Sequence, residues 1–63
     1  MKLTDIQPGD TIIADGGFTC MRAGPTVVQA DNAGLYVKCS EGRHYLDGQE
    51  DEAGELIGLS AAP

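Results

Sequence analysis

The residues of this chain that could carry chemistry are two cysteines and the single histidine, Cys20, Cys39 and His44. Thiolates and imidazole are good zinc ligands, but a structural zinc site needs a fourth ligand and normally contains cysteines a few residues apart, which this sequence lacks. A Cys39–His44 nucleophilic dyad would need an orienting third group and a cleft. We therefore interpret these side chains as buried thiols beside a partly buried histidine, and predict no catalytic residue, no metal and no cofactor.

A disulfide between Cys20 and Cys39 is a further possibility, and it would contribute about 3 kcal/mol in the chain-entropy account. The opening segment Met1–Asp5 lacks the apolar core of a secretory signal. We therefore expect a cytoplasmic protein, in which cysteines stay reduced. No apolar run approaches the roughly 18 residues that span a bilayer, so we expect no membrane partner.

A second group of residues is suited to recognition. Tyrosine and arginine dominate the energetics of protein interfaces, and aromatic rings can also stack on bases. Both tyrosines of the chain and two of its four basic residues lie close together in the sequence. The candidate binding surface consists of Tyr36, Lys38, Arg43 and Tyr45, and we call it the tyrosine face. The alternative is ordinary cross-strand pairing, with Lys38 lying over the ring of Tyr45.

An acidic stretch lies at residues 47–55. An EF-hand calcium loop requires glycine at its sixth position and glutamate at its twelfth. Counted from Asp47, these positions hold Glu52 and Gly58, so the pattern fails at both. We interpret the stretch as a solvated hairpin loop, with weak cation binding or a basic partner as the alternative. Its carboxylates are Asp47, Glu50, Asp51, Glu52 and Glu55.

The elements that must position these residues are short β-strands. Nine glycines interrupt the chain every few residues, and each would cost a helix interior about 1 kcal/mol relative to alanine. Gln7–Asp10 fits a type II turn, and Asp31–Gly34 fits a type I turn closed by a glycine bulge. Short β-rich segments between such turns are typical of an all-β sandwich or barrel. The predicted strands cover residues 11–14, 18–21, 26–30, 35–39, 43–46 and 56–59.

The predicted hairpin around Glu41–Gly42 determines on which face of the sheet each candidate side chain lies. If these two residues form the loop, Cys39 lies opposite His44 and Val37 lies opposite Leu46. Alternate residues of the hairpin then form an apolar face that packs in the core. This predicted core face consists of Val28, Ala30, Leu35, Val37, Cys39, His44 and Leu46.

The same register puts the tyrosine face on the solvent side of the hairpin. It predicts that Lys38 lies opposite Tyr45 and that Tyr36 lies opposite Asp47. Strands with a single apolar face must curl to cover it, which predicts a small, strongly bent barrel. Exposed edge strands would leave a homodimer open.

The segment Ile6–Ile12, with its Pro8-Gly9-Asp10 turn, resembles the entry to the first strand of SH3-like and KOW-like barrels. This resemblance implies one small SH3-like barrel over residues 1–63, with five or six short antiparallel strands, little or no helix, and the acidic loop at 47–55. The whole chain is also similar to small stand-alone bacterial proteins of uncharacterised function, chiefly through Gly34–Val37 and His44–Gly48. Such barrels serve as adaptors, nucleic-acid binders or structural modules, so the resemblance implies a fold more than an activity.

The net charge of −6 disfavours binding to phosphate backbones. Most of it lies in residues 47–63, with a net charge of −5, whereas residues 1–46 carry only −1. We predict a non-enzymatic module that binds another protein through the tyrosine face. The alternatives are a weak single-stranded nucleic-acid binder that uses the same face, and an acidic inhibitor or nucleic-acid mimic that acts through the acidic loop.

Overall fold

A computed structural model describes residues 1–17, 20 and 22–63, and within them the chain is built from strands and two short 3₁₀-helices. The all-β prediction is confirmed for this part of the chain. The predicted strand at 18–21 falls largely outside the described residues. The elements are η1 (Leu3–Asp5), β1 (Thr11–Ala14), β2 (Gly24–Val27), β3 (Gln29–Asp31), β4 (Gly34–Cys39), β5 (Gly42–Tyr45), η2 (Leu46–Gln49) and β6 (Leu59–Ala61). No described helix has the length and apolar character needed to cross a membrane.

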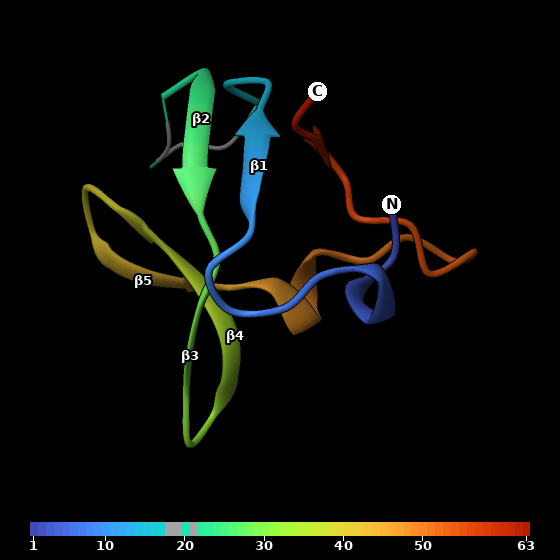
Figure 1. The fold of residues 1–63 in the computed structure, drawn as a ribbon, viewed down its shortest axis with the longest axis horizontal. Coiled ribbons are helices and arrows are strands. Elements are labelled where there is room, and N and C mark those ends of the chain that lie inside the picture. Colours follow the sequence, from blue (N-terminus) through green and yellow to red (C-terminus); the bar gives the residue numbers. More distant parts are fainter. Residues whose placement is uncertain (18–19, 21) are drawn as a thin grey trace.

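The strands form two antiparallel sheets of three strands, in the orders β2-β1-β6 and β3-β4-β5. Figure 1 shows the chain passing directly from β2 into β3, and so from one sheet to the other. The sheets do not close into the predicted barrel, because the predicted strand 26–30 is divided at Val28. The backbone of Val28 pairs with the turn before β1: its N–H donates to the Asp10 carbonyl and its carbonyl accepts from the Gly9 N–H, both at 2.8 Å.

The turn at Gln7–Asp10 has the predicted geometry. Gly9, at its third position, has a φ of 97°, and the Asp10 N–H donates to the Gln7 carbonyl at 3.1 Å. The Asp10 carboxylate also accepts from the Gln7 N–H at 3.0 Å. This turn fixes both the start of β1 and the bend at Val28.

The core lies between the two sheets. Val28, Val37 and Leu46 are buried as predicted, and Leu35 packs against the core at partial exposure. Ala30 is exposed, so its predicted core position is wrong. It pairs with Leu35 in the β3–β4 hairpin, which extends away from the rest of the molecule in Figure 1. The buried core residues are Ile12, Ala14, Val28, Val37, Leu46, Leu56 and Leu59.

The β4–β5 hairpin turns one residue earlier than predicted. Cys39 pairs with Gly42, so Ser40 and Glu41 form the connection, and Gly42 has a φ of 115°. A glycine with positive φ after two turn residues is the type I turn with glycine bulge. The predicted pairs Cys39–His44 and Val37–Leu46 are therefore wrong, and Val37 pairs with His44 instead. The pairing moves by two residues, so every side chain keeps its predicted face.

The segment after β5 turns back and packs beside the N-terminus. It begins with η2, which buries Leu46, and returns as a hairpin through the bridge between Glu50 and Leu56. The N-terminus lies beside it, because the Leu56 N–H donates to the Met1 carbonyl at 2.8 Å. The predicted loop at 47–55 is thus a 3₁₀-turn followed by a hairpin, and the last strand is Leu59–Ala61 rather than 56–59.

Candidate functional site

The β4–β5 hairpin brings the four residues of the tyrosine face together. Tyr36 pairs with Tyr45, and Lys38 pairs with Arg43, so all four side chains leave the sheet on the same side. The predicted pairs of Lys38 with Tyr45 and of Tyr36 with Asp47 are wrong, for the register reason given above. The prediction that these residues share one face was independent of that two-residue change.

Tyr36 is more buried than the prediction of a solvent-exposed ring required. Its exposed fraction is 6%, whereas Lys38 and Arg43 are exposed and Tyr45 is half-buried. The Tyr36 and Tyr45 rings are tilted by 57° with centroids 5.7 Å apart. The Tyr36 hydroxyl donates to the Gln29 side-chain oxygen at 3.2 Å. The Tyr36 ring is therefore the buried base, or floor, of the tyrosine face. Its accessible part consists of Lys38, Arg43 and Tyr45.

Asp31 organises this surface. One of its carboxylate oxygens accepts a hydrogen bond from the Tyr45 hydroxyl at 2.5 Å and also pairs with the Arg43 guanidinium. The other oxygen accepts from the Ala33 N–H at 2.8 Å. The guanidinium lies over the Tyr36 ring, 4.8 Å from its centroid. The observed cation–π pair is therefore Arg43 with Tyr36, in place of the predicted Lys38 with Tyr45.

These contacts stabilise the ordinary charge states of the three polar groups. The hydrogen bond from Tyr45 lowers the pKa of the Asp31 carboxyl, and hydrogen bonds from the Ala33 N–H and Arg43 act in the same direction. The hydrogen bond to Asp31 raises the pKa of the Tyr45 hydroxyl. The hydrogen bond to Asp31 also raises the pKa of Arg43. The network is therefore an anion, a cation and a neutral phenol over a wide range of pH.

Sequence reasoning placed Asp31 only in a turn and missed its role. Asp31 pairs with Gly34, and Gly34 adds no side chain to the face between β3 and β5. The Asp31 carboxylate can therefore reach across β4 to Arg43 and Tyr45. The signal was available, because the prediction that Ala30 lies on the core face puts its neighbour Asp31 on the opposite face, with Tyr36.

On the opposite side of the hairpin, Cys20, Cys39 and His44 form a second site, which we call the thiol cluster. One potential ligand atom from each residue lies within 4.8 Å of the others, and all three side chains are half-buried. Cys39 and His44 come from β4 and β5, as predicted for one face. Cys20 joins them from the connection between β1 and β2, which the sequence did not predict.

The backbone of Cys20 is held by the β4–β5 turn. Its carbonyl accepts from the Ser40 N–H at 3.0 Å and from the Ser40 hydroxyl at 3.2 Å. Ser40 directly follows Cys39, so the same turn positions both thiols. The Cys20 sulfur lies 3.5 Å from the His44 Nδ1 atom.

Gln49 orients the histidine ring. Its side-chain NH₂ donates to the Ile57 carbonyl at 3.5 Å, which turns its oxygen toward His44. That oxygen lies 2.9 Å from His44 Nε2, and because an amide oxygen only accepts, Nε2 carries the proton. In the neutral ring, Nδ1 then presents its lone pair to the Cys20 sulfur. Gln49 was not among the predicted site residues, because its position depends on η2.

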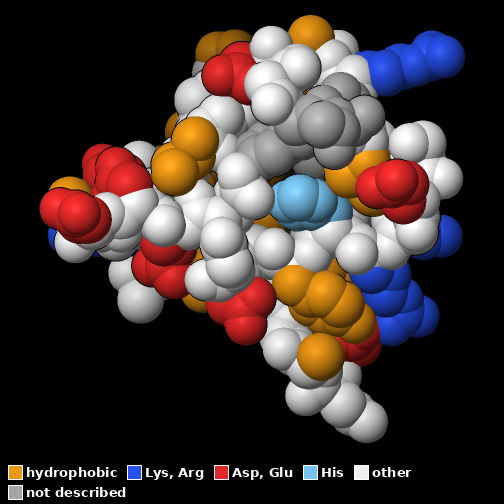
Figure 2. Space-filling model, turned by 180° about the vertical axis from the view of Figure 1, so that it is seen from behind, with side chains coloured by type: hydrophobic (Ala, Val, Ile, Leu, Met, Phe, Trp, Pro, Cys, Tyr) orange, Lys and Arg blue, Asp and Glu red, His pale blue; other side chains and the backbone are white. Residues whose placement is uncertain are grey.

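The Cys20 thiol is stabilised in its protonated form. The hydrogen bond with Cys39, followed by burial, raises the pKa of Cys20 to about 11. A thiol of this kind is a poor nucleophile at neutral pH, because the thiolate is the reactive species. Cys20 and Cys39 line an open groove of about 380 Å³, together with Arg22 and Lys38. Figure 2 shows the histidine at the surface near the middle of the rear view.

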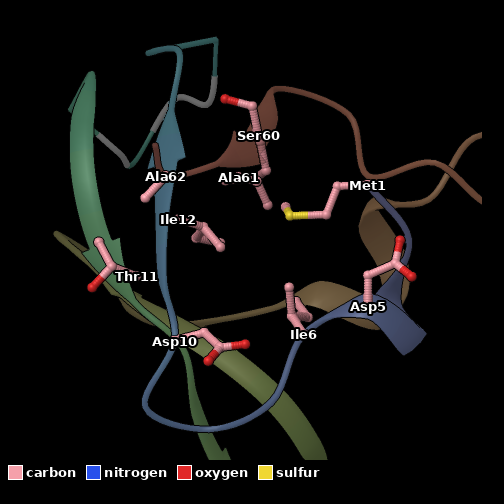
Figure 3. Close-up of a pocket in the computed structure, with 10 residues that line it drawn as sticks. Met1, Asp5, Ile6, Asp10, Thr11, Ile12, Ser60, Ala61 and Ala62 are labelled. Atoms are coloured by element: carbon pink, nitrogen blue, oxygen red, sulfur yellow. The ribbon is translucent and has the colours of Figure 1, made fainter.

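A second groove, of about 500 Å³, lies between β1 and the N-terminal segment. Figure 3 shows the apolar side chains of Met1, Ile6 and Ile12 directed toward it, with Asp5 and Asp10 at its edge. These two carboxylates accept hydrogen bonds from the backbone N–H groups of residues 2 and 7. The groove is thus an apolar depression whose polar groups serve the local backbone.

The acidic stretch does not gather into a cation site within the described residues, where the thiol cluster is the group found with metal-ligand spacing. One oxygen of Asp51 accepts from the N–H groups of Ala53 and Glu55, both at 2.9 Å. Glu55 pairs with the N-terminal amino group at 3.2 Å. These two carboxylates therefore shape the loop.

Comparisons with protein-family models, with curated proteins and with solved structures give no match for this chain. Function must therefore be argued from the two sites themselves.

Proposed function

We propose that this protein is a cytoplasmic, non-enzymatic module that binds an acidic segment of another protein through the tyrosine face. We also propose that its two sheets are an open variant of the SH3-like architecture, as the Pro8-Gly9-Asp10 turn before β1 suggests. The observation that carries the functional proposal is the pairing of two cations, Lys38 and Arg43, directly across the hairpin.

Like charges at directly opposed positions destabilise a sheet. The chain has only four basic residues against ten acidic ones, so such a pair is unexpected by composition alone. Asp31 compensates Arg43, whereas Lys38 makes no ion pair with any described residue. A local excess of positive charge remains on an otherwise acidic protein, and an acidic partner would neutralise it.

The surface around Lys38 is also pre-organised. Asp31 and the Tyr36 ring hold the Arg43 guanidinium, although 53% of that side chain is exposed. The Tyr45 hydroxyl is fixed by the same carboxylate. Binding therefore immobilises few additional rotamers, which lowers the entropic cost of association. Burial of Tyr36 leaves Tyr45 as the one partly accessible ring of the tyrosine face for base stacking, which favours a protein partner over a single strand of nucleic acid.

The test is affinity capture from a cytosolic lysate with three forms of the protein: wild type, Lys38→Glu and Lys2→Glu. Lys2 is exposed and lies at the N-terminus, so its reversal changes net charge equally without touching the tyrosine face. We expect a partner that wild type and Lys2→Glu retain and that Lys38→Glu loses. With the isolated partner, the affinity should fall by roughly fivefold or more and weaken with added salt.

Retention of the partner by Lys38→Glu would remove this surface from consideration. Release of the captured material by nuclease would instead support the nucleic-acid alternative. Loss of binding in a Glu52→Gln variant, with Lys38→Glu unaffected, would point to the acidic loop.

A further inference from the structure

We propose that Cys20, Cys39 and His44 form a zinc(II) site, with water as the fourth ligand. Two thiolates and one imidazole are a ligand set that suits zinc, and three protein ligands with one open position are an established zinc arrangement. This reverses the prediction of no metal, which rested on the absence of closely spaced cysteines. The fold supplies the missing proximity, because it brings residues 20 and 39 together.

The spacing of the ligand atoms agrees with tetrahedral zinc. Zinc–sulfur and zinc–nitrogen bonds of about 2.3 and 2.0 Å at a tetrahedral angle put a sulfur and a nitrogen ligand about 3.5 Å apart. Cys20 Sγ and His44 Nδ1 are separated by 3.5 Å. All three ligand atoms lie within 4.8 Å of one another.

The histidine has the outer contact that zinc sites use. A metal-bound histidine normally donates its other ring N–H to an oxygen acceptor, which fixes the tautomer and the ring orientation. His44 Nε2 donates in this way to the Gln49 oxygen at 2.9 Å, and Ile57 fixes the Gln49 amide. The lone pair that zinc needs is thereby on Nδ1, the atom nearest the Cys20 sulfur.

An ion can reach the site, and its binding requires only the loss of protons. Two of the three ligand residues, Cys20 and Cys39, line the open groove of about 380 Å³, through which an ion and a water molecule can approach them. On binding, each thiol loses its proton to solvent and each sulfur donates an electron pair to zinc, while the imidazole stays neutral. Zinc uptake should therefore release two protons per ion. No oxidant or reductant is involved, which distinguishes this site from a Cys20–Cys39 disulfide.

The experiment uses the full chain, reduced, stripped of metal by a chelator and titrated with cobalt(II) as a spectroscopic substitute for zinc. We expect tetrahedral d–d absorption and a thiolate-to-cobalt charge-transfer band, both abolished when zinc displaces cobalt. Calorimetry of zinc binding in buffers of different ionisation enthalpy should give one zinc and two protons released.

Matched variants test each assigned role. Cys20→Ser and Cys39→Ser should each weaken the thiolate band and zinc affinity, and Gln49→Leu should lower zinc affinity by roughly tenfold while the band is retained. Glu52→Gln, in the acidic loop, should bind as wild type does. Circular dichroism of the metal-free variants identifies any that fail to fold. Protection of both thiols from alkylation by zinc in the wild type provides a readout that needs no variant.

Several results would overturn the proposal. These are a cobalt complex without thiolate absorption, thiols that zinc leaves open to alkylation, or a folded Cys39→Ser variant with wild-type zinc affinity. Loss of zinc binding in Glu52→Gln would show that the acidic loop holds the ion.

Discussion

The two faces of the β4–β5 hairpin use alternate residues of the same strands, but they are built differently. On the tyrosine face, the network of hydrogen bonds and ring contacts joins residues of one sheet: Asp31 from β3, Tyr36 from β4, and Arg43 and Tyr45 from β5. On the opposite face, the thiol cluster draws Cys20 from the β1–β2 connection and is oriented from η2. One face is completed by neighbouring strands and the other by separate segments of the chain.

This difference separates two uses of polar side chains. The tyrosine face satisfies most of its own charge, so its network contributes to stability and leaves mainly Lys38 to a partner. The thiol cluster instead brings two sulfurs and a ring nitrogen within 4.8 Å of one another, and thiols are weak hydrogen-bonding groups. Ligand atoms of this kind, gathered in one place, suit the zinc ion proposed above. Figure 2 adds that the acidic side chains lie mainly on one side of the rear view and the basic ones on the other.

The largest effect is expected from removing the floor of the tyrosine face. Tyr36→Ala deletes a nearly buried ring together with its contacts to Tyr45 and Arg43, and should lower the free energy of unfolding by about 3 kcal/mol. Tyr36→Phe keeps the ring and loses only the hydrogen bond to Gln29, which should cost about 1 kcal/mol. Urea unfolding measures both. Equal effects of the two substitutions would mean that the hydroxyl, and not the ring, supports the face.

Zinc should stabilise the fold through the opposite face. At a free zinc concentration 100 times the Kd, linkage predicts a gain of about 2.7 kcal/mol in the free energy of unfolding. Cys39→Ser should abolish this gain, whereas Tyr45→Phe, on the tyrosine face, should preserve it. Thermal unfolding with zinc and with chelator measures the difference. A gain that survives Cys39→Ser would show that zinc stabilises the protein from somewhere other than the thiol cluster.

In a plot of unfolding free energy against pH, the decreases at low pH (the acid limb) and at high pH (the alkaline limb) should both depend on the tyrosine face. The Asp31 pKa is lowered in the folded protein, so its contribution is present above its unfolded pKa, about 3.8, and is lost as pH falls through the folded value. The Tyr45 pKa is raised, so its contribution is complete below about pH 10 and is lost as pH rises through the folded value.

Two variants separate these limbs. Asp31→Asn should flatten the acid limb and Tyr45→Phe the alkaline limb of a plot of unfolding free energy against pH. The effects should be modest, because solvent screens partly exposed groups. An acid limb unchanged in Asp31→Asn would assign it to other carboxylates.

The smallest effect on stability is expected from the cross-strand pair of Lys38 and Arg43. Lys38→Glu replaces a repulsive cross-strand pair with an attractive one and should raise the melting temperature by about 2 °C, while it weakens partner binding. Lys2→Glu provides the control for the change in net charge. A decrease in melting temperature on Lys38→Glu would mean that the Lys38 stem packs in a way that outweighs the charge.

Much of the tyrosine face could be predicted because it follows from alternation along two strands. The parity of Tyr36, Lys38, Arg43 and Tyr45 is the same in the predicted and observed registers, which differ by two residues. What failed were features decided by turn geometry and by curvature. Gly42 is the bulge residue after the turn, and the bend at Val28 divides a predicted strand and leaves the sheets unclosed.

The thiol cluster could be predicted only in part. Cys39 and His44 lie on one face by strand alternation, so their proximity was accessible. The approach of Cys20 depends on two hydrogen bonds to Ser40, and the orientation of His44 depends on Gln49 and Ile57. No sequence spacing encodes these contacts, because Cys20 meets Ser40 only in the tertiary fold, and Gln49 reaches His44 and Ile57 only through the turn of η2.

The sequence by itself determined an all-β chain, the turn before β1, the faces of the central hairpin and the concentration of negative charge near the C-terminus. These features follow from local backbone preferences, from the period of two and from composition. Only the tertiary structure decided that Tyr36 is buried, that Asp31 reaches across β4, and that two distant cysteines meet a histidine. Those outcomes depend on how remote segments pack together, and local preferences do not fix that packing.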